Sequence, residues 1–313
     1  MAFVEAPAIA RPVTEPPRTA RDEGTGGLSG VKGGVGSSVY CMPYKSRVNG
    51  VPRTSYMSAQ GDQLRLRAVP VDGRPALRPF FGYYGGKWRD ATKYYPEPKH
   101  GLVVEPFAGS AGYALRYAHL KVVLCELDPV VFAVWKYLTK VKDSEIRKLP
   151  LLRPGQSVDD LHLPPEPSWL IGFWLNRATA SPRKNPSAWM RSGVRPGSFW
   201  GERVRDTIAS QVEFIQHWKV YHRSYENCPV KKSATWFIDP PYQRAGKHYK
   251  LGSEQIDFRQ LADWCRSRKG QVIVCENQGA DWLDFQPLAS VKTTRRGRRS
   301  VEVIWTNQPR VRP

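Results

Sequence analysis

The sequence predicts an α/β fold in which a mainly parallel sheet is covered by helices on both faces. A strand, a glycine-rich turn, a helical stretch and a second strand follow one another over residues 102–125. Two further apolar runs, at 234–238 and 271–275, enclose a segment with the apolar spacing of a helix. Strands that alternate with helices form parallel sheets, and their helices pack on both sides.

Residues 102–125 form the first strand-helix-strand unit, which the change in apolar spacing along the chain indicates. Residues 102–105 form a short β-branched run, and residues 106–112 hold the glycines of a tight turn. Residues 113–119 have the pattern of a helix, and residues 121–125 that of a second buried strand. The sequence therefore predicts a βαβ unit.

The second half repeats the alternation. Between its two buried strands, apolar side chains recur at helical spacing: Phe258, Leu261, Trp264 and Cys265. Residues 301–305 form a last alternating run. We therefore expect a helix between two central strands and a final strand at the end of the chain.

Changes in composition and apolar periodicity divide the chain into segments. Residues 1–77 are rich in Pro, Ala, Gly and Ser without periodicity, which predicts a disordered or weakly ordered tail. Residues 78–145 and 233–313 have the globular pattern described above. Residues 146–232 differ, with Pro-rich connections, a Trp-rich helix expected at 169–177 and a long helix expected from Glu202 to about Tyr221. We interpret them as a mainly helical insertion.

Charge indicates the class of partner. The 313 residues contain 48 Lys and Arg against 28 Asp and Glu, a net charge of +20, which is typical of proteins that bind nucleic acid. Five cysteines at irregular spacing give neither a disulfide framework nor a metal knuckle. No apolar run is long enough for a membrane span, and the first residues lack a secretory signal. We expect a cytoplasmic protein that does not bind membranes or metals.

The glycine-rich turn at 104–112 is a candidate ligand site. Glycines let a backbone approach a ligand closely, and a helix N-terminus favours negative charge, although such turns also serve plain packing. The next strand ends at Glu126, Leu127 and Asp128, where a carboxylate could bind the two hydroxyls of a ribose. Either acid could instead cap the following helix.

A more specific signal lies at the end of the buried strand 234–238. There Asp239, Pro240, Pro241 and Tyr242 follow one another. Two prolines end backbone pairing and fix the chain at the carboxyl edge of the sheet, where ligands bind in α/β folds. A fixed acceptor beside a fixed aromatic ring suits a planar base with an exocyclic amine. The alternative is a simple strand stop with a surface tyrosine.

A third segment, residues 80–87, places aromatic side chains before Gly85, Gly86 and Lys87. It could form a lid over a ligand, with the lysine reaching a ligand carboxylate, or merely an aromatic-rich hairpin. It does not follow a strand, and no Ser or Thr follows the lysine, which excludes a phosphate-binding Walker loop.

Taken in this order, the three segments resemble the alpha group of DNA adenine N6-methyltransferases over most of residues 78–313. The resemblance implies a Rossmann-like fold and S-adenosylmethionine as the cofactor. It makes residues 78–145 and 233–313 the methyltransferase core, and residues 146–232 the inserted target-recognition region.

The resemblance also implies the site residues. The Gly-Gly-Lys segment would contact the methionine end of the cofactor through Tyr83, Gly86 and Lys87. The loop would contribute Glu105, Pro106, Phe107 and Gly109, and Glu126 would be the ribose-binding acid. The catalytic motif would be Asp239, Pro240, Pro241 and Tyr242, with Asp239 also beside the cofactor.

The chain departs from the family pattern in two places. Family members often have a second glycine two positions after the first, where this chain has Ala111 and then Gly112. After Asn176 and Arg177, residues 178–184 replace the Phe-Asn-Gly of better known members. A target sequence therefore cannot be transferred from the family.

The insertion has the charge expected of a duplex-binding surface. Residues 171–232 carry eleven Lys or Arg against four acids, and residues 295–299 form a second basic run in an expected hairpin turn. We expect nucleic-acid contacts from Asn176, Arg177, Arg183, Lys184, Arg191, Arg195, Arg296 and Arg298. The insertion's tryptophans are expected in the core rather than stacked on bases: Trp169, Trp174, Trp189, Trp200 and Trp218.

The sequence therefore predicts methyl transfer from S-adenosylmethionine to the N6 amine of adenine in double-stranded DNA, with the base flipped out of the helix. The alternatives are an RNA adenine or cytosine N4 methyltransferase and a non-catalytic DNA-binding relative. Transfer to cytosine C5 is disfavoured, because that reaction needs a cysteine, commonly after proline, and no cysteine follows a proline here. We expect a monomer or weak dimer in a prokaryotic or phage-infected cell; a cognate restriction endonuclease is a partner that such an enzyme can have.

Overall fold

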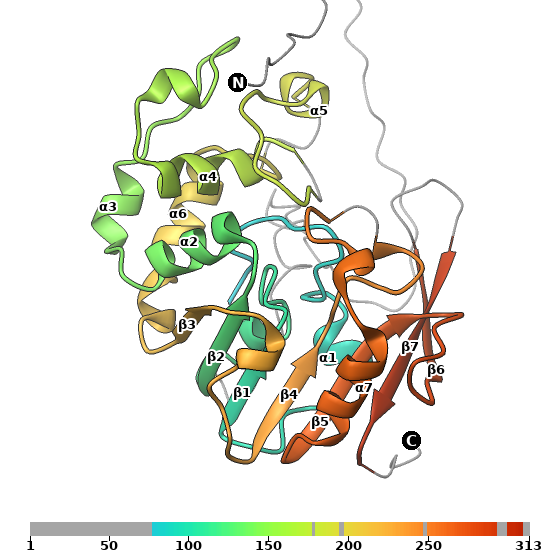
Figure 1. Cartoon of the computed structure of the whole chain (residues 1–313). Coiled ribbons are helices and arrows are strands. Elements are labelled where there is room, and N and C mark those ends of the chain that lie inside the picture. The colour runs from blue at the N-terminus through green and yellow to red at the C-terminus, as the bar shows by residue number, and fades with distance from the viewer. Residues whose placement is uncertain (1–76, 177–178, 194–196, 247–248, 293–298, 309–313) are drawn as a thin grey trace, which may run out of the picture. The chain divides into compact units, whose positions relative to one another are not determined.

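A computed structural model describes residues 77–176, 179–193, 197–246, 249–292 and 299–308. All but the last residue of the expected tail lies outside this part. The described chain builds one seven-stranded sheet in the order β3-β2-β1-β4-β5-β7-β6 (Figure 1). Its strands are β1 (Leu102–Glu105), β2 (Lys121–Glu126), β3 (Lys219–His222), β4 (Ala234–Ile238), β5 (Gly270–Asn277), β6 (Gln286–Lys292) and β7 (Arg299–Thr306).

The pairing of the strands confirms the expected mainly parallel sheet. From β3 to β5, each strand is parallel to its neighbour. Only β7 runs antiparallel, paired with β5 on one side and with β6 on the other. The sheet is therefore mixed, with an antiparallel hairpin at one end.

Both faces of the sheet are buried. Successive side chains of a strand point to opposite sides, so each strand contributes to the apolar cluster on each face. Val103 and Leu124 belong to one apolar cluster, whereas Val104 and Cys125 belong to the other. Helices α1 (Ala91–Tyr94), α2 (Pro129–Leu138), α4 (Pro165–Phe173) and α6 (Glu202–Ala209) contribute to the first cluster. Helix α7 (Phe258–Arg266) covers the second, on the side of the sheet opposite to α1 (Figure 1).

Helix α2 illustrates how local sequence specifies such an element. The Asp128 carboxylate accepts a hydrogen bond from Val130 N (2.8 Å), and Pro129 occupies the first helical position. Its buried side chains, Val131, Val134, Trp135 and Leu138, recur at helical spacing. Full burial of one such side chain contributes roughly 1.5–3 kcal/mol. None of the described helices combines the length and apolar composition of a bilayer span.

The single helix expected from Glu202 to about Tyr221 is wrong. Helix α6 ends at Ala209, a 3-10 turn covers Val212–Ile215, and β3 pairs with β2 at the edge of the sheet. Buried Val212 and Ile215 keep the apolar spacing of a helix, which hides the break in the sequence. The segment 146–232 therefore also supplies an edge strand. The Trp-rich helix begins earlier than expected, at Pro165, and ends at Phe173.

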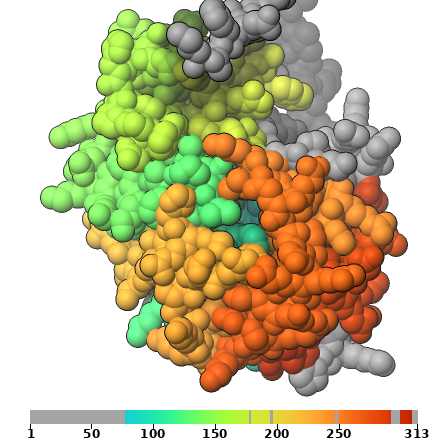
Figure 2. Space-filling model, in the orientation of Figure 1, coloured from blue at the N-terminus to red at the C-terminus, as the bar shows by residue number. Residues whose placement is uncertain are grey.

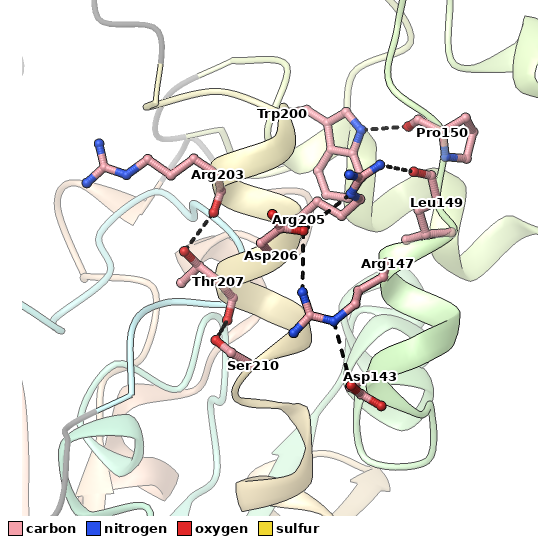
Figure 3. A network of polar contacts seen from close by, with 10 residues as sticks. All are labelled: Asp143, Arg147, Leu149, Pro150, Trp200, Arg203, Arg205, Asp206, Thr207 and Ser210. Atoms are coloured by element: carbon pink, nitrogen blue, oxygen red, sulfur yellow. Dashed lines mark hydrogen bonds and ion pairs between the residues drawn. The ribbon is translucent and has the colours of Figure 1, made fainter.

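Polar contacts tie α6 to α3 (Asp143–Arg147), as Figure 3 shows. A guanidinium nitrogen of Arg147 lies 3.6 Å from an oxygen of Asp206, and Trp200 Nε1 donates to the carbonyl of Pro150 (2.9 Å). The ion pair is half exposed and contributes little, whereas the tryptophan bond satisfies a partly buried donor. This packing holds the segment before α4 against α6.

Candidate functional site

A cavity of about 280 Å³ opens at the carboxyl ends of β1, β2 and β4, where ligands bind in open α/β sheets. Figure 2 shows the hollow between the green and orange parts of the molecule. Its described walls come from residues 83–87, 105–110, 112, 126–128, 224–226, 237, 239, 241, 249–252, 255 and 256. The three segments singled out in the sequence therefore meet at one cavity.

Glycines let the Gly-Gly-Lys segment and the loop after β1 pack directly on each other. A Cβ on Gly112 would lie 2.6 Å from the backbone nitrogen of Trp88, and one on Gly86 would lie 2.8 Å from Ser110 Oγ. Gly109 has a φ of +45° and lies under the Tyr83 ring. Ala111 also has a positive φ, 50°, a conformation that glycine adopts more easily.

Glu105 ends β1 and holds the loop from inside the protein. Its carboxylate is buried and accepts a hydrogen bond from Ala114 N (2.6 Å). Burial raises the pKa of Glu105 to about 8, so it is largely protonated at neutral pH. The helix expected at 113–119 is wrong in extent, because only a 3-10 turn forms, Ala114–Tyr117. Its N-terminus is occupied by Glu105, which leaves no anion site there.

Glu126 joins the end of β2 to the same loop. Its carboxylate accepts hydrogen bonds from Gly109 N (2.8 Å) and from Leu127 N and Asp128 N (both 2.9 Å). Burial raises its pKa, and these backbone donors oppose the rise. Both acids considered for the ribose line the cavity, and Asp128 also caps α2.

Asp239 faces Lys87 at the cavity wall. The ammonium nitrogen of Lys87 lies 3.0 Å from Asp239 Oδ1 and donates to the carbonyl of Gly85 (3.1 Å). Burial raises the pKa of Asp239, although Lys87 counteracts this. Burial alone would lower the pKa of Lys87, but the carboxylates of Asp239 and Glu302 hold it above the usual range. The contact at 3.0 Å makes Asp239 and Lys87 a close, largely buried pair at the cavity wall.

Tyr242 lies beside this pair. Its hydroxyl donates to Glu302 Oε2 (2.7 Å), and the Lys87 nitrogen lies 4.8 Å from the centre of its ring. Asp239 and Pro241 line the cavity, whereas Pro240 and Tyr242 are not among its described lining residues. Burial raises the pKa of Tyr242 well above its usual value, so the phenol remains a hydrogen-bond donor.

Two acids of the C-terminal strands support the site and were missed in the sequence. Glu276, fully buried at the end of β5, accepts hydrogen bonds from Gln243 N (2.7 Å) and Trp282 Nε1 (3.1 Å). It thereby fixes the chain that follows Tyr242. Glu302, on β7, binds the hydroxyl of Tyr242 itself. An acid directly after a buried apolar run was the available signal for Glu276; for Glu302 none existed.

Aromatic residues form the remaining walls. The rings of Phe107 and Tyr225 stack with centroids 5.3 Å apart. The Tyr249 hydroxyl donates to the carbonyl of Tyr84 (3.1 Å), which places the segment 249–256 over the Gly-Gly-Lys turn. No pattern in the sequence indicated that Tyr225 or this segment belongs to the site.

The cavity lining is acidic, whereas the chain as a whole is basic. Its described lining carries five acids and two lysines: Glu105, Glu126, Asp128, Glu226, Asp239, Lys87 and Lys250. Even with Glu105 protonated, the acids outnumber the bases, in a chain of net charge +20. Such a cavity suits a small ligand with positive charge and disfavours a phosphate group.

The expected nucleic-acid residues that the structure describes are not part of these walls. Arg183, Lys184 and Arg191 are exposed, and Lys184 pairs with Asp159 (2.7 Å). Asn176 is half-buried. None of these four lines the described cavity. The other expected contacts lie outside the described residues: Arg177, Arg195, Arg296 and Arg298.

The expected burial of the tryptophans holds for all but one. Trp200 and Trp218 are buried, and Trp169 and Trp174 pack partly buried against the core. Trp189 contradicts the expectation, because 61% of it is exposed. It lies on α5 (Ala188–Arg191), a single turn that is too short to bury every large side chain.

No protein-family model matches this chain, and no curated protein matches its sequence at a significant level. The cavity, its charges and the Lys87–Asp239 pair are therefore the observations from which a function is inferred.

Proposed function

We propose that this protein is an S-adenosylmethionine-dependent methyltransferase that acts on the N6 amine of adenine in double-stranded DNA. The observation that carries the proposal is the position of Asp239. It lies in the wall of an acid-rich cavity at the carboxyl ends of parallel strands, beside the fixed ring of Tyr242. The antiparallel hairpin at the end of an otherwise parallel sheet also fits a methyltransferase-like topology.

The cavity suits this cofactor better than a nucleotide phosphate. S-adenosylmethionine, when bound, supplies a methyl group on a positively charged sulfur. The acids of the lining favour that charge, whereas they would repel a pyrophosphate. Glu126 lines the cavity and would accept hydrogen bonds from ribose hydroxyls, and Leu127, 48% exposed at the cavity, would offer an apolar face for a ring.

Asp239 would activate the substrate amine. The lone pair of an adenine amine is delocalised into the ring, so the nitrogen is a weak nucleophile until acceptors hold its hydrogens. Asp239 supplies one acceptor in the cavity wall, and the carbonyl of the next residue, Pro240, which is not among the described lining residues, would supply the second at the end of β4. The bound cofactor would supply a methyl group on a sulfur that leaves with the bonding electrons. The amine nitrogen would form the new bond with its lone pair, and its extra proton would pass to water. Asp239 stabilises the positive charge that develops on the nitrogen, which favours the transition state over the ground state.

The adenine must leave the duplex to reach this cavity, because its amine is paired within the helix. The half-buried Tyr242 ring gives the flipped base a fixed face for stacking. The positive charge of the chain supplies the affinity for phosphates, and exposed Arg183 and Arg191 are candidate contacts. An acidic cavity and a basic exterior thus suit a cationic cofactor and a polyanionic substrate.

The test identifies the product. The full chain is incubated with DNA or RNA and with cofactor labelled in its methyl group, and the nucleic acid is digested to nucleosides. We expect labelled N6-methyldeoxyadenosine from DNA. Label in RNA or on cytosine N4 would establish one of the alternative activities, and cofactor binding without transfer would indicate a non-catalytic relative. Loss of label in an Asp239→Ala variant assigns the activity to this cavity.

A further inference from the structure

Glu302 lies between Tyr242 and Lys87, two residues of the candidate site. It lies on β7, opposite Asn277 of β5, and its side chain is 14% exposed. Its Oε2 atom accepts the Tyr242 hydroxyl at 2.7 Å and lies 4.0 Å from the Lys87 nitrogen. Glu302 therefore accepts the Tyr242 hydroxyl and lies at the outer limit of an ion pair with Lys87, the residue that pairs with Asp239.

The Lys87 ammonium has three acceptors within reach. Asp239 Oδ1 is 3.0 Å away, the carbonyl of Gly85 is 3.1 Å away, and Glu302 Oε2 is 4.0 Å away. In the proposed reaction Asp239 shares its acceptors between the Lys87 ammonium and the substrate amine, which weakens its hold on the ammonium. A buried ammonium without any carboxylate partner would be strongly destabilised. A second carboxylate removes that obstacle.

We infer that Glu302 is a positioning residue for the transfer, holding the Lys87 ammonium while Asp239 binds the substrate amine and fixing the Tyr242 ring through its hydroxyl. The inference rests on the proposed function. It assigns Glu302 two separable roles: its charge acts on Lys87, and its hydrogen bond acts on Tyr242.

Substitutions separate these roles. Glutamine at position 302 keeps an oxygen that can accept the Tyr242 hydroxyl but carries no charge for Lys87. Alanine removes both. Tyr242→Phe removes the hydrogen bond and leaves the charge near Lys87 in place. Asp284→Asn is a matched control, because Asp284 is an exposed acid of the same C-terminal region whose side chain bonds Gln286.

The experiment measures single-turnover methylation of duplex DNA by the full chain at saturating cofactor. Cofactor affinity, DNA affinity and the free energy of unfolding are measured on the same proteins. We expect Glu302→Gln to slow transfer about tenfold or more, since the variant has no charge to hold the Lys87 ammonium, with both affinities within about threefold of wild type. Asp284→Asn should behave as wild type. Tyr242→Phe should slow transfer in the wild-type and Glu302→Gln backgrounds, but not in the Glu302→Ala background.

Three outcomes would overturn the inference. An active wild-type chain whose Glu302 variants transfer at the same rate would overturn it and leave the proposed function intact. Equal effects of Tyr242→Phe in all backgrounds would remove the hydrogen-bonding role. A slower rate accompanied by weakened cofactor binding and a lower free energy of unfolding would make Glu302 a structural residue. No transfer by the wild-type chain would instead overturn the proposed function, and with it this role.

Discussion

The Lys87 ammonium lies 3.0 Å from a carboxylate oxygen of Asp239, although Lys87 precedes β1 in the chain and Asp239 follows β4. Their meeting depends on the sheet, because β4 pairs with β1 and both strands end at the same edge. The Gly-Gly-Lys turn reaches that edge by packing on the loop after β1, with Gly112 at their contact. The pair thus joins the N-terminal and C-terminal halves of the described chain at the cavity.

Asp239 should be essential for turnover and dispensable for DNA binding. Asp239→Ala removes the charged acceptor, so we expect the single-turnover rate to fall by at least about 100-fold, with DNA affinity nearly unchanged. Asp239→Asn should be intermediate, because an amide oxygen accepts a hydrogen bond without charge. The exposed Asp263→Ala variant is the control. A wild-type rate in Asp239→Ala would remove the tetrad from the mechanism.

Gly112 should tolerate no side chain. An added methyl group would meet the backbone of Lys87 and Trp88, which cannot rotate away as a side chain can. We expect Gly112→Ala to lower the free energy of unfolding by about 1–3 kcal/mol and to weaken cofactor binding. Gly101→Ala is the control, because its added Cβ would have no neighbour within 4 Å. Chemical denaturation and calorimetry measure the two effects; equal behaviour of the two variants would contradict the proposed packing.

The free energy of unfolding should fall as the pH rises through the range in which Glu105 is protonated in the folded chain but ionised in the unfolded chain. Burial raises its pKa from 4.5 to about 8, so between these values the folded protein holds a proton that the unfolded chain releases. This single group lowers the free energy of unfolding by at most about 1.4 kcal/mol per pH unit. Glu105→Gln removes that slope. The stability of the variant relative to the wild-type protein should therefore be greater at pH 8 than at pH 5. Parallel curves of unfolding free energy against pH for the two proteins would show that Glu105 ionises freely in the folded state.

Trp189 should contribute to DNA binding through its ring. It is the most exposed of the large apolar side chains in the described part, and it lies near Arg191 on α5. If it stacks on bases, Trp189→Ala should weaken DNA affinity by about 1–3 kcal/mol without changing its salt dependence. Phe214→Ala is the control, since Phe214 is similarly exposed but lies beyond α6. Equal DNA affinity of the two variants would exclude this role.

DNA affinity should fall steeply with salt, as expected when Lys and Arg displace counterions from phosphates. Arg183→Gln and Lys184→Gln should each reduce the slope of log affinity against log salt by about 0.9, the value expected for one phosphate per cation. Lys184 pairs with exposed Asp159, an interaction weak enough to yield to a phosphate. Fluorescence anisotropy over a salt series gives the slope. An unchanged slope would place the DNA surface elsewhere.

The sequence by itself determined where the central strands lie and where chemistry is concentrated. Runs such as 102–105 and 234–238 are apolar on both faces, and that pattern survives folding because parallel strands are covered on both sides. Asp239 could be placed at the carboxyl edge of the sheet because two prolines follow it and end the strand there. The apolar pattern of a strand and the position of its end both depend on residues that are neighbours in the sequence, so the sequence alone predicts them.

Only the tertiary structure decided which strands are neighbours and which distant acids reach the site. Strand β3 has a short, half-polar sequence and forms because β2 offers it backbone hydrogen bonds. Glu302 reaches Tyr242 because β7 inserts antiparallel between β5 and β6. Apolar period tells which face of a strand is buried but not which strand lies beside it. The support of the site by Glu276 and Glu302 therefore could not be read from the chain alone, since it depends on pairings between residues far apart in sequence.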